Sequence, residues 1–364
     1  MEEGATRIVF AGGGTAGHLH PALAVAREIG DRRPAASIAF VGARRGLERR
    51  LVPAAGYPLM ALSLSGLKGQ SALRRVGAAA AAGWAVARCA VWMLFRRPSL
   101  VIGVGGFASG PAVLAARLLR IRTMVLEQNH YPGATNRWLA PRVDAVCLPS
   151  ETAREHLRGK TYVTGNPVRP ELLEIGEPPG GDALSLLVFG GSRGARSINR
   201  AVRAALDRLS RIDPPPRIVH QTGADDEDEL RAGYAAYPAG RHEVGAYFED
   251  LPARLAASDL VVCRAGASTI AELCAAGRPA ILVPYPHAAD DHQRHNAETL
   301  ERAGAAILLP DAELSGDRVA DAVAELASDP ERRKAMGRAA RSLARPDAAR
   351  RIADVAEQLL RGAA

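Results

Sequence analysis

The feature that most constrains the fold of this chain is a pattern that occurs twice: a short apolar strand, a glycine-rich loop and a helix. The first copy begins with the strand Arg7–Ala11, and its loop reads GGGTAG. The second begins with the strand Leu184–Phe189, after a Gly- and Pro-rich linker at residues 176–182, and its loop reads GGSRG. Because this unit opens parallel, doubly wound sheets, we predict an α/β chain with two such domains.

Length and composition agree with two globular domains. The chain has 364 residues, of which 48% are hydrophobic and 24% charged, values typical of a soluble protein of more than one domain. The acidic N-terminus leads directly into the first strand, so we expect no signal peptide and a cytosolic protein. The four cysteines lie far apart without a C-x-x-C pair, which predicts buried thiols and neither a disulfide framework nor a zinc site: Cys89, Cys147, Cys263 and Cys274.

Positive charge is concentrated in the first half of the chain. The net charge is +8, but residues 40–126 alone contain thirteen Lys and Arg against a single acid, Glu48. Such a surface favours a polyanion, either nucleic acid or anionic lipid. Because no helix-turn-helix, zinc finger or aromatic platform accompanies the charge, we predict an anionic membrane surface as the partner and no nucleic acid.

An Ala-rich apolar run from Val76 to Phe95 lies within this basic region. It is about long enough to cross a bilayer, but Arg88 near its centre argues against crossing. Two interpretations stay open: a half-buried helix of the first domain, or a helix that also rests an apolar face on a membrane. Val76, Trp84 and Trp92 are the candidates for that face.

The first glycine loop also has two interpretations. Its spacing matches the dinucleotide fingerprint G-x-G-x-x-G, which would indicate a nicotinamide-dependent oxidoreductase. That fingerprint needs an acid at the end of the next strand, but the predicted strand Ser37–Val41 is followed by GARR. What remains is a loop with open backbone amides, the Thr15 hydroxyl and the His18 imidazole. His18 is either a packing residue or a general base, since an imidazole can accept a proton at neutral pH.

Polar residues gather where other predicted strands end, which is where ligands bind in doubly wound sheets. Glu127 and Asn129 stand at one such end. Arg169 lies in a hinge-like segment, where its guanidinium can pair with a diphosphate. Asp226-x-Asp228 formally resembles the metal-binding D-x-D of some sugar transferases, but it lies at a helix start, where acids suit the helix dipole. We therefore expect no metal.

The densest candidate site follows the predicted strand Leu260–Cys263, where a small-residue turn leads into a helix that carries Glu272. Gly266 lets a ligand approach the backbone, and we expect Ser268 and Thr269 to cap the helix. The free amides at the helix start favour an anion, and Glu272 one turn later can reach a diol beside it. These features predict a nucleotide site. The alternative is a turn that only packs a helix on a strand.

Eight motifs resemble, in this order, those of the MurG family of GT-B glycosyltransferases, and together they span nearly the whole chain: GGGTAGHLHPALAVA, GLKG, GVGGFASGPAVLAA, LEQNHYPGATN, GNPVR, GGSRGARSIN, VCRAGASTIAEL and ADDHQRHNA. The resemblance implies two Rossmann-like doubly wound domains facing across a cleft, with a C-terminal helix that returns to the first domain. We therefore expect an acceptor- and membrane-binding domain at residues 1–166 with the returning helix at 346–364, and a UDP-sugar-binding domain at residues 167–345.

The resemblance also implies a donor site for UDP-N-acetylglucosamine. Glu272 would hold the ribose, Phe248 would lie beside the uracil, Arg169 and Ser192 would contact the diphosphate, and Gln293 would contact a sugar hydroxyl. The implied substrate contacts in full are Thr15, Ala16, Gly17, Asn129, Arg169, Ser192, Phe248, Ala267, Ser268, Thr269, Ile270, Ala271, Glu272 and Gln293.

Two departures from the family pattern lie close together. His292 stands where members often have a second glutamine, and the loop at residues 287–291 is one residue longer than in some members. This loop precedes a helix that we expect to begin near Asp290.

The chemistry implied is an inverting transfer of GlcNAc to the 4-hydroxyl of MurNAc in undecaprenyl-pyrophosphoryl-MurNAc-pentapeptide, which converts lipid I to lipid II in peptidoglycan synthesis. Helix amides and Arg169 would stabilise the charge on the diphosphate, so neither a metal nor a cofactor is implied. His18 is our hypothesis for the general base, and Glu127 is the alternative. The resemblance places such an enzyme on the cytoplasmic face of the bacterial plasma membrane as a peripheral protein. A GT-B glycosyltransferase acting on another lipid, such as diacylglycerol, is the alternative function.

Overall fold

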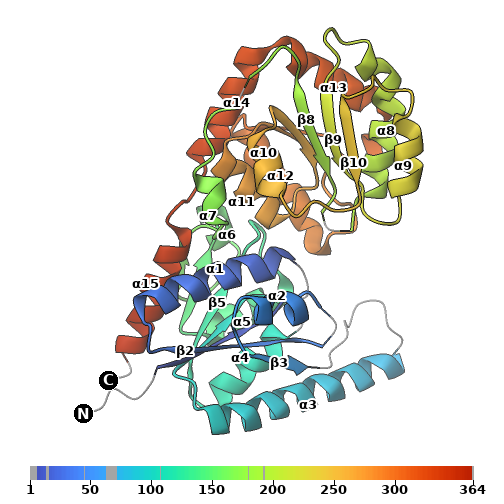
Figure 1. The fold of residues 1–364 in the computed structure, drawn as a ribbon. Helices are drawn as coiled ribbons and strands as arrows, with labels where there is room; N and C mark the ends of the chain where they lie inside the picture. Colours follow the sequence, from blue (N-terminus) through green and yellow to red (C-terminus); the bar gives the residue numbers. More distant parts are fainter. Residues whose placement is uncertain are drawn as a thin grey trace. The chain divides into compact units, whose positions relative to one another are not determined.

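The structure, a computed structural model, describes residues 6–13, 16–44, 46–62, 72–106, 108–178, 180–191 and 193–362, and it describes no side chains at residues 16 and 72–79. The chain forms two compact units (Figure 1). Unit 1 comprises residues 1–168 and 345–364, and unit 2 comprises residues 169–344. The chain therefore passes from one unit to the other twice.

Unit 1 is built on a parallel sheet of seven strands in the order β3-β2-β1-β4-β5-β6-β7. These strands are β1 (Arg7–Ala11), β2 (Ser37–Ala43), β3 (Leu59–Leu62), β4 (Leu100–Gly103), β5 (Arg122–Leu126), β6 (Ala145–Leu148) and β7 (Thr161–Val163). Side chains alternate along each strand, so Ile8 and Phe10 of β1 enter one hydrophobic cluster while Val9 and Ala11 enter another. Both faces of the sheet are therefore buried.

Helices cover both faces of this sheet. The helices of unit 1 are α1 (Ala16–Arg32), α2 (Glu48–Ala54), α3 (Ala72–Arg96), α4 (Ser109–Leu118), α5 (Ala134–Leu139), the 3-10 turn η1 (Ala140–Arg142), α6 (Glu151–Arg154) and α15 (Ala348–Arg361). α15 packs against α1 and buries Ile352, Val355 and Leu359 on one face. α3 packs against α4 and buries Cys89 and Met93 on the other. The last helix of the chain thus belongs to the first sheet, as predicted.

Unit 2 repeats the architecture with six parallel strands in the order β10-β9-β8-β11-β12-β13. These strands are β8 (Ser185–Phe189), β9 (Arg217–Gln221), β10 (His242–Gly245), β11 (Leu260–Cys263), β12 (Ala280–Leu282) and β13 (Ala306–Leu308). Its helices are α7 (Pro170–Leu173), α8 (Arg196–Ser210), α9 (Glu227–Tyr234), α10 (Leu251–Ala256), α11 (Ala267–Ala276), η2 (Ala289–Asp291), α12 (His292–Arg302), η3 (Asp311–Glu313), α13 (Gly316–Ser328) and α14 (Pro330–Ser342). The predicted pair of doubly wound α/β sheets is confirmed.

The strands that the sequence pattern missed all lie at an edge of a sheet. β3 and β7 are the two edges of the first sheet and β13 is an edge of the second, and each has only three or four residues. Most of their residues are half-buried, whereas the equally short β11 is buried throughout, so the contrast between an apolar run and its surroundings is weaker in these three strands.

The helix expected near Asp290 begins instead at His292. Asp290 and Asp291 have φ values of 53° and 51°, in the left-handed region, so a right-handed α-helix cannot run through them. The predicted start was wrong by two residues for this reason.

α3 is a half-buried helix that also has an exposed apolar stripe. Ala85, Cys89 and Met93 are buried against the sheet, whereas the opposite stripe exposes 73% of Trp84, 54% of Val91 and 83% of Phe95. Among the helices that the structure describes, none has both the length and the apolarity needed to cross a bilayer.

Of the three residues predicted for the exposed apolar face, Trp84 is exposed, and the other two differ from it. Trp92 was predicted to be exposed, but it is half-buried and packs on the cluster beneath the helix, because its position turns it toward the sheet. The side chain of Val76 lies outside the part of the chain that is described.

Candidate functional site

In unit 2, the strand order reverses direction between β8 and β11, and ligands bind at such a switch point. α11 begins directly after β11, with Gly266 as its N-cap residue. The first backbone amides of an α-helix have no acceptor within the helix, so those of Ala267, Ser268 and Thr269 face the turn. The expected capping by Ser268 or Thr269 is wrong: the helix starts one residue before Ser268, and within the described residues no side chain caps it.

Glu272 and Arg169 form an ion pair beside this helix start, with 3.1 Å between Glu272 Oε1 and Arg169 Nη2. Both side chains are largely buried. Burial raises the pKa of Glu272, and the charge and hydrogen bond of Arg169 oppose that rise. Arg169 Nε is also buried and finds no acceptor in the described part of the chain. The guanidinium therefore keeps a donor available for an anion.

Arg264, which the sequence reasoning did not single out, holds the surrounding loops together. Its Nη1 donates to Asp311 Oδ1 at 2.6 Å and to the carbonyl oxygens of Val283 and Pro284 at 3.1 Å, and its Nη2 donates to Ser197 Oγ at 2.7 Å. These partners follow β12 and open α8 and η3. One guanidinium thus links the ends of β11 and β12 to the start of α8. No local pattern could reveal it, because its partners are distant in sequence.

The other predicted donor contacts in unit 2 lie around the same edge of the sheet. Phe248 donates its backbone N–H to Gln221 Oε1 at 2.9 Å, and the Arg254 guanidinium lies 3.7 Å from the centre of its ring. Gln293 Oε1 accepts from the Tyr285 N–H at 3.0 Å, which ties the start of α12 to the loop after β12. In α11, Ile270 is buried and its N–H bonds the Gly266 carbonyl, whereas Ala271 is half-buried; Ser192 lies outside the described residues.

In unit 1, the switch point lies between β1 and β4, and two glycine loops meet there. Gly13 donates its N–H to the Gly105 carbonyl at 3.2 Å. A Cβ at Gly12 would lie 2.1 Å from the Gly105 oxygen, and one at Gly106 would lie 2.2 Å from the Gly13 oxygen. Only glycine at these positions permits such close backbone contact.

His18 lies in the first turn of α1, over the second glycine loop. A Cβ built at Gly105 would be 2.8 Å from His18 Nε2 and 3.6 Å from Gln128 Oε1, so both side chains lie close to Gly105. Gln128 is buried, and its Nε2 donates to the Val104 carbonyl at 3.3 Å. Its Oε1 has no donor among the residues described. A buried acceptor without a donor carries a desolvation cost of about 1–3 kcal/mol, which a bound hydroxyl would relieve.

The remaining predicted residues of this loop are only partly described. Gly17 is the second residue of α1 and is half-buried. Thr15 and the side chain of Ala16 lie outside the described residues.

Glu127 organises the loop that follows β5. Its Oε1 accepts from the Asn129 N–H at 2.8 Å and from Asn129 Nδ2 at 3.1 Å, and its Oε2 accepts from the Gly133 N–H at 3.0 Å and from Asn136 Nδ2 at 2.8 Å. A carboxylate with four donors orients its neighbours, and Asn129 is the predicted site residue that it orients.

An acid does reach the end of β2, although the sequence pattern indicated none there. Glu48 of α2 turns back so that its Oε1 accepts from the Ala43 N–H at 3.0 Å. Its carboxyl group passes so close to Gly13, Gly42 and Gly46 that a Cβ at any of them would come within 2.9 Å of its atoms. Because Glu48 is only 1% exposed, it fills the space beneath the glycine loop and is not open to a ribose. The residues that directly follow the strand include no acid, as the sequence indicates, and the weakness of the dinucleotide interpretation stands.

Asp226 serves the fold of unit 2. Its carboxylate accepts from Asn199 Nδ2 at 2.8 Å and from Arg196 Nε at 3.3 Å, which joins α8 to the start of α9. In the parts of the chain that are described, no group of three or more His, Cys, Asp or Glu side chains is arranged to hold a metal ion.

Comparison with known proteins identifies the family of both halves of the chain. Residues 8–148 match the glycosyltransferase family 28 N-terminal domain, and residues 185–357 match the glycosyltransferase family 28 C-terminal domain. The chain is 43% identical over 357 residues to the "UDP-N-acetylglucosamine--N-acetylmuramyl-(pentapeptide) pyrophosphoryl-undecaprenol N-acetylglucosamine transferase" of Myxococcus xanthus, an alignment that covers 97% of this chain and 93% of that relative. It is 42% identical over 354 residues to the protein of the same name from Geobacter sulfurreducens, covering 96% and 97% of the two chains.

A solved structure gives the same result. The crystal structure of MurG from Acinetobacter baumannii aligns with a TM-score of 0.81 and 29% identity, over 97% of this chain and 99% of that one. The chain therefore belongs to glycosyltransferase family 28 and, within it, to the MurG family.

Proposed function

We propose that this chain is an inverting N-acetylglucosaminyltransferase that moves GlcNAc from UDP-GlcNAc to the 4-hydroxyl of MurNAc in undecaprenyl-pyrophosphoryl-MurNAc-pentapeptide. The relatives with 42–43% identity carry this activity in their names. The single observation of the structure that supports it most is the Arg169–Glu272 pair beside the open amides of α11. Amides and a guanidinium suit a diphosphate, and a carboxylate one helical turn away suits the ribose hydroxyls.

In the proposed reaction, unit 2 binds the donor and stabilises the leaving group. The MurNAc 4-hydroxyl oxygen forms a bond to C1 of GlcNAc on the face opposite UDP, and the bond from C1 to the diphosphate oxygen breaks with its electron pair. Negative charge then grows on the diphosphate. The amides of Ala267, Ser268 and Thr269 and the guanidinium of Arg169 are preorganised for this charge, and such donors contribute about 3 kcal/mol each.

Unit 1 supplies the group that takes the hydroxyl proton, and we assign this role to His18. Its imidazole and the unpartnered Gln128 oxygen both lie close to Gly105. That oxygen can accept a hydrogen bond from the hydroxyl or from the imidazolium after proton transfer. Glu127, the alternative base, already accepts four hydrogen bonds, which favours a role in positioning Asn129.

Substitution of His18 tests the base. His18→Ala should lower kcat by about 100-fold or more with little change in the affinity for UDP, because a general base contributes about 10²–10⁴-fold. His20→Ala, two residues further along α1, is the matched control and should keep kcat within a few-fold. Near-normal turnover in His18→Ala would remove His18 from the mechanism and return attention to Glu127.

A comparison of acceptors tests the function itself. The purified chain should transfer GlcNAc from UDP-GlcNAc to the undecaprenyl-linked muramyl-pentapeptide, and transfer to diacylglycerol should be absent. The converse result would establish the alternative lipid glycosyltransferase. Thermal stabilisation by NAD but not by UDP would contradict both proposals and favour an oxidoreductase.

We further propose that unit 1 binds peripherally to the cytoplasmic face of the plasma membrane through α3. Trp84, Val91 and Phe95 form an exposed apolar stripe that also contains Arg88. Beside it, α3, α4 and α5 border a shallow groove of about 400 Å³ whose lining is mostly apolar, including Trp138. An apolar stripe that carries arginines suits the boundary between acyl chains and anionic headgroups.

Vesicle binding tests this surface. Phe95→Glu should reduce cosedimentation with phosphatidylglycerol vesicles by several-fold, because it places a carboxylate in the apolar stripe. Tyr247→Glu makes the same change of charge at an exposed aromatic residue of unit 2 and should leave the bound fraction unchanged. An equal loss of vesicle binding in both variants would mean that added negative charge, and not the apolar stripe of α3, determines binding.

A further inference from the structure

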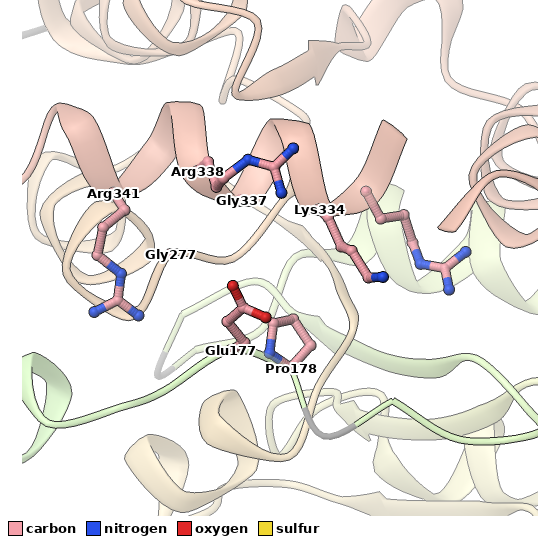
Figure 2. A pocket seen from close by; sticks show the side chains of 8 residues that line it. Glu177, Pro178, Gly277, Lys334, Gly337, Arg338 and Arg341 are labelled. Carbon is pink, nitrogen blue, oxygen red and sulfur yellow. The ribbon is translucent and has the colours of Figure 1, made fainter. Parts of the chain in front are cut away.

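A second pocket of unit 2 lies at the opposite end of α11 from the donor site. It has a volume of about 200 Å³, and its charged lining comes from α14 and from the segment that precedes β8. Figure 2 shows the side chains of Lys334 and Arg341 pointing from α14 toward the segment that carries Glu177, and the side chain of Arg338 lying along the helix. Arg333 completes the charged lining. We refer to these five residues as the α14 pocket.

Two glycines bring α14 close enough to form this pocket. Gly277 ends α11 in a left-handed conformation with a φ of 61°. A Cβ at Gly337 would lie 2.7 Å from the Gly277 carbonyl oxygen, so α14 rests on the end of α11 at this point. Residues 334, 338 and 341 share one face of α14 at the spacing i, i+4 and i+7. Three long cationic side chains therefore border a pocket next to the close contact between Gly337 and Gly277.

The positive charge of this region is only partly neutralised. Arg341 Nη2 donates to the carbonyl oxygen of Ala276 at 3.0 Å. Arg278, which is 1% exposed, donates to four carbonyl oxygens, including that of Ala276 at 2.9 Å. Carbonyl groups satisfy these donors without cancelling their charge. Burial and the neighbouring Arg341 accordingly lower the pKa of Arg278 to about 10.

The pocket lining itself has four cations and one carboxylate. Lys334 also pairs with Glu331 outside the lining, at 2.8 Å. Arg338 has no carboxylate within ion-pair distance among the described residues, and Glu177 is the single acid of the lining. The Arg338 guanidinium therefore forms no ion pair among the described residues, although Lys334 and Arg338 both help to lower the pKa of the exposed Glu331.

We propose that the α14 pocket binds a phosphate group, either as free phosphate or diphosphate or as the headgroup of an anionic phospholipid. A guanidinium presents paired N–H donors to phosphate oxygens, and Lys adds a point charge. A volume of about 200 Å³ is below the range of about 300–1,000 Å³ of pockets that take drug-sized ligands, so it suits a small anion. α11 has ten residues, a length of about 15 Å, which separates this pocket from the amides of Ala267 to Thr269.

Occupation of the pocket would connect the two segments through which the chain enters and leaves unit 2. Glu177 lies shortly after the entry at residue 169, and α14 ends at Ser342, shortly before the exit at residue 344. Arg341 already joins them by donating to the Ile175 carbonyl. A phosphate held between Arg338 and this segment would add a second link, so ligand binding should stabilise unit 2 against unfolding.

Calorimetric titration of the full chain with inorganic phosphate and with diphosphate, in the presence of saturating UDP, tests the proposal. UDP occupies the donor site in this experiment, so the remaining binding reports the α14 pocket. Lys334→Ala with Arg338→Ala should weaken this binding by at least 10-fold. Arg332→Ala removes a cation of α14 that pairs with Glu325 outside the pocket and should leave binding unchanged. Glu177→Gln should strengthen binding several-fold, because it removes the competing carboxylate.

The source of the phosphate is resolved by a parallel titration with vesicles of phosphatidylglycerol and of phosphatidylcholine, with and without the double substitution at Lys334 and Arg338. Binding of free phosphate identifies a soluble anion, and binding confined to phosphatidylglycerol identifies a headgroup. The proposal is overturned if saturating UDP abolishes all phosphate binding, if Arg332→Ala weakens it as much as the double substitution, or if neither source binds. The arm with UDP rests on the proposed donor site, whereas the comparison of the double substitution with Arg332→Ala does not depend on the transferase function.

Discussion

At the scale of single residues, Glu272 and Arg169 carry the proposed donor site. They neutralise each other across 3.1 Å, and Arg169 Nε has no acceptor in the described chain. The pair therefore keeps a carboxylate and a guanidinium largely buried at low cost, since an isolated buried charge would be strongly unfavourable.

Glu272→Gln should weaken UDP binding by about 10- to 100-fold, because a hydrogen bond to a charged group contributes about 1.5–3 kcal/mol. Calorimetry measures the change, and Glu313→Gln on the surface of unit 2 is the control. The wild-type affinity should also fall as the pH decreases, starting above the usual carboxyl range, because burial raises the pKa of Glu272. The Gln variant should not show this dependence, and a parallel decline in both proteins would contradict the role of Glu272.

His220 links stability to pH through burial. It is fully buried between Tyr234 and Asn199, each 3.1 Å from a ring nitrogen, and burial lowers its pKa to about 3. The unfolded chain, in which the pKa is about 6.5, binds a proton more readily between these values, so unfolding is favoured as the pH falls below 6.5.

This single residue should cost about 3 kcal/mol of stability at pH 4 relative to pH 7. Urea unfolding of the full chain at several pH values measures the slope. His220→Gln should be less stable at pH 7 but should show a smaller loss on acidification, whereas His295→Gln at a more exposed site should keep the wild-type slope. An unchanged slope in His220→Gln would mean that other groups control the acid sensitivity.

At the scale of elements, the two glycine loops of unit 1 determine where His18 can lie. Gly105 has a φ of 86°, and a Cβ there would come within 2.7 Å of the His18 ring. Gly56 has a similar φ of 83°, but a Cβ there meets nothing within 4 Å. A comparison of substitutions at Gly105 and Gly56 therefore separates the effect of backbone strain from the effect of a collision with the His18 imidazole.

Both Gly105→Ala and Gly56→Ala should lose about 1–3 kcal/mol of stability from the left-handed conformation. Only Gly105→Ala should also lose turnover, by 10-fold or more, while its UDP affinity stays unchanged. Thermal unfolding and steady-state kinetics of the two variants measure these effects. Equal activity of the two variants would show that the position of His18 over the loop is not needed for catalysis.

At the scale of the whole molecule, the chain returns to its first unit after completing the second. Ile352 of α15 is 1% exposed within the core of unit 1, although it follows all of unit 2 in sequence. Ile352→Ala should destabilise unit 1 by about 2–5 kcal/mol. Hydrogen exchange should therefore accelerate in peptides of β1 and α1 but not in those of unit 2, and Val323→Ala in α13 should give the reverse pattern. Uniform acceleration in both units would mean that they unfold as one.

The sequence determined the features that depend on neighbouring residues. Central strands such as β1 and β11 were predicted with their observed limits, because a buried strand is a continuous apolar run bounded by turn residues. The glycine turns and Glu272 were likewise apparent, because each belongs to one strand–turn–helix unit. The assignments of His18, Asn129 and Gln293 to substrate contacts remain predictions.

Only the tertiary structure decided which distant groups meet. Glu48 reaches back beneath the first glycine loop, and Arg264 joins three loops. Arg278 and Arg341 both bond the carbonyl that ends α11, and the edge strand β3 forms on its neighbour. Each of these interactions joins segments that are far apart in the chain. They form only when the fold brings those segments together. Local periodicity carries no information about such contacts, because it records only how a residue relates to its near neighbours.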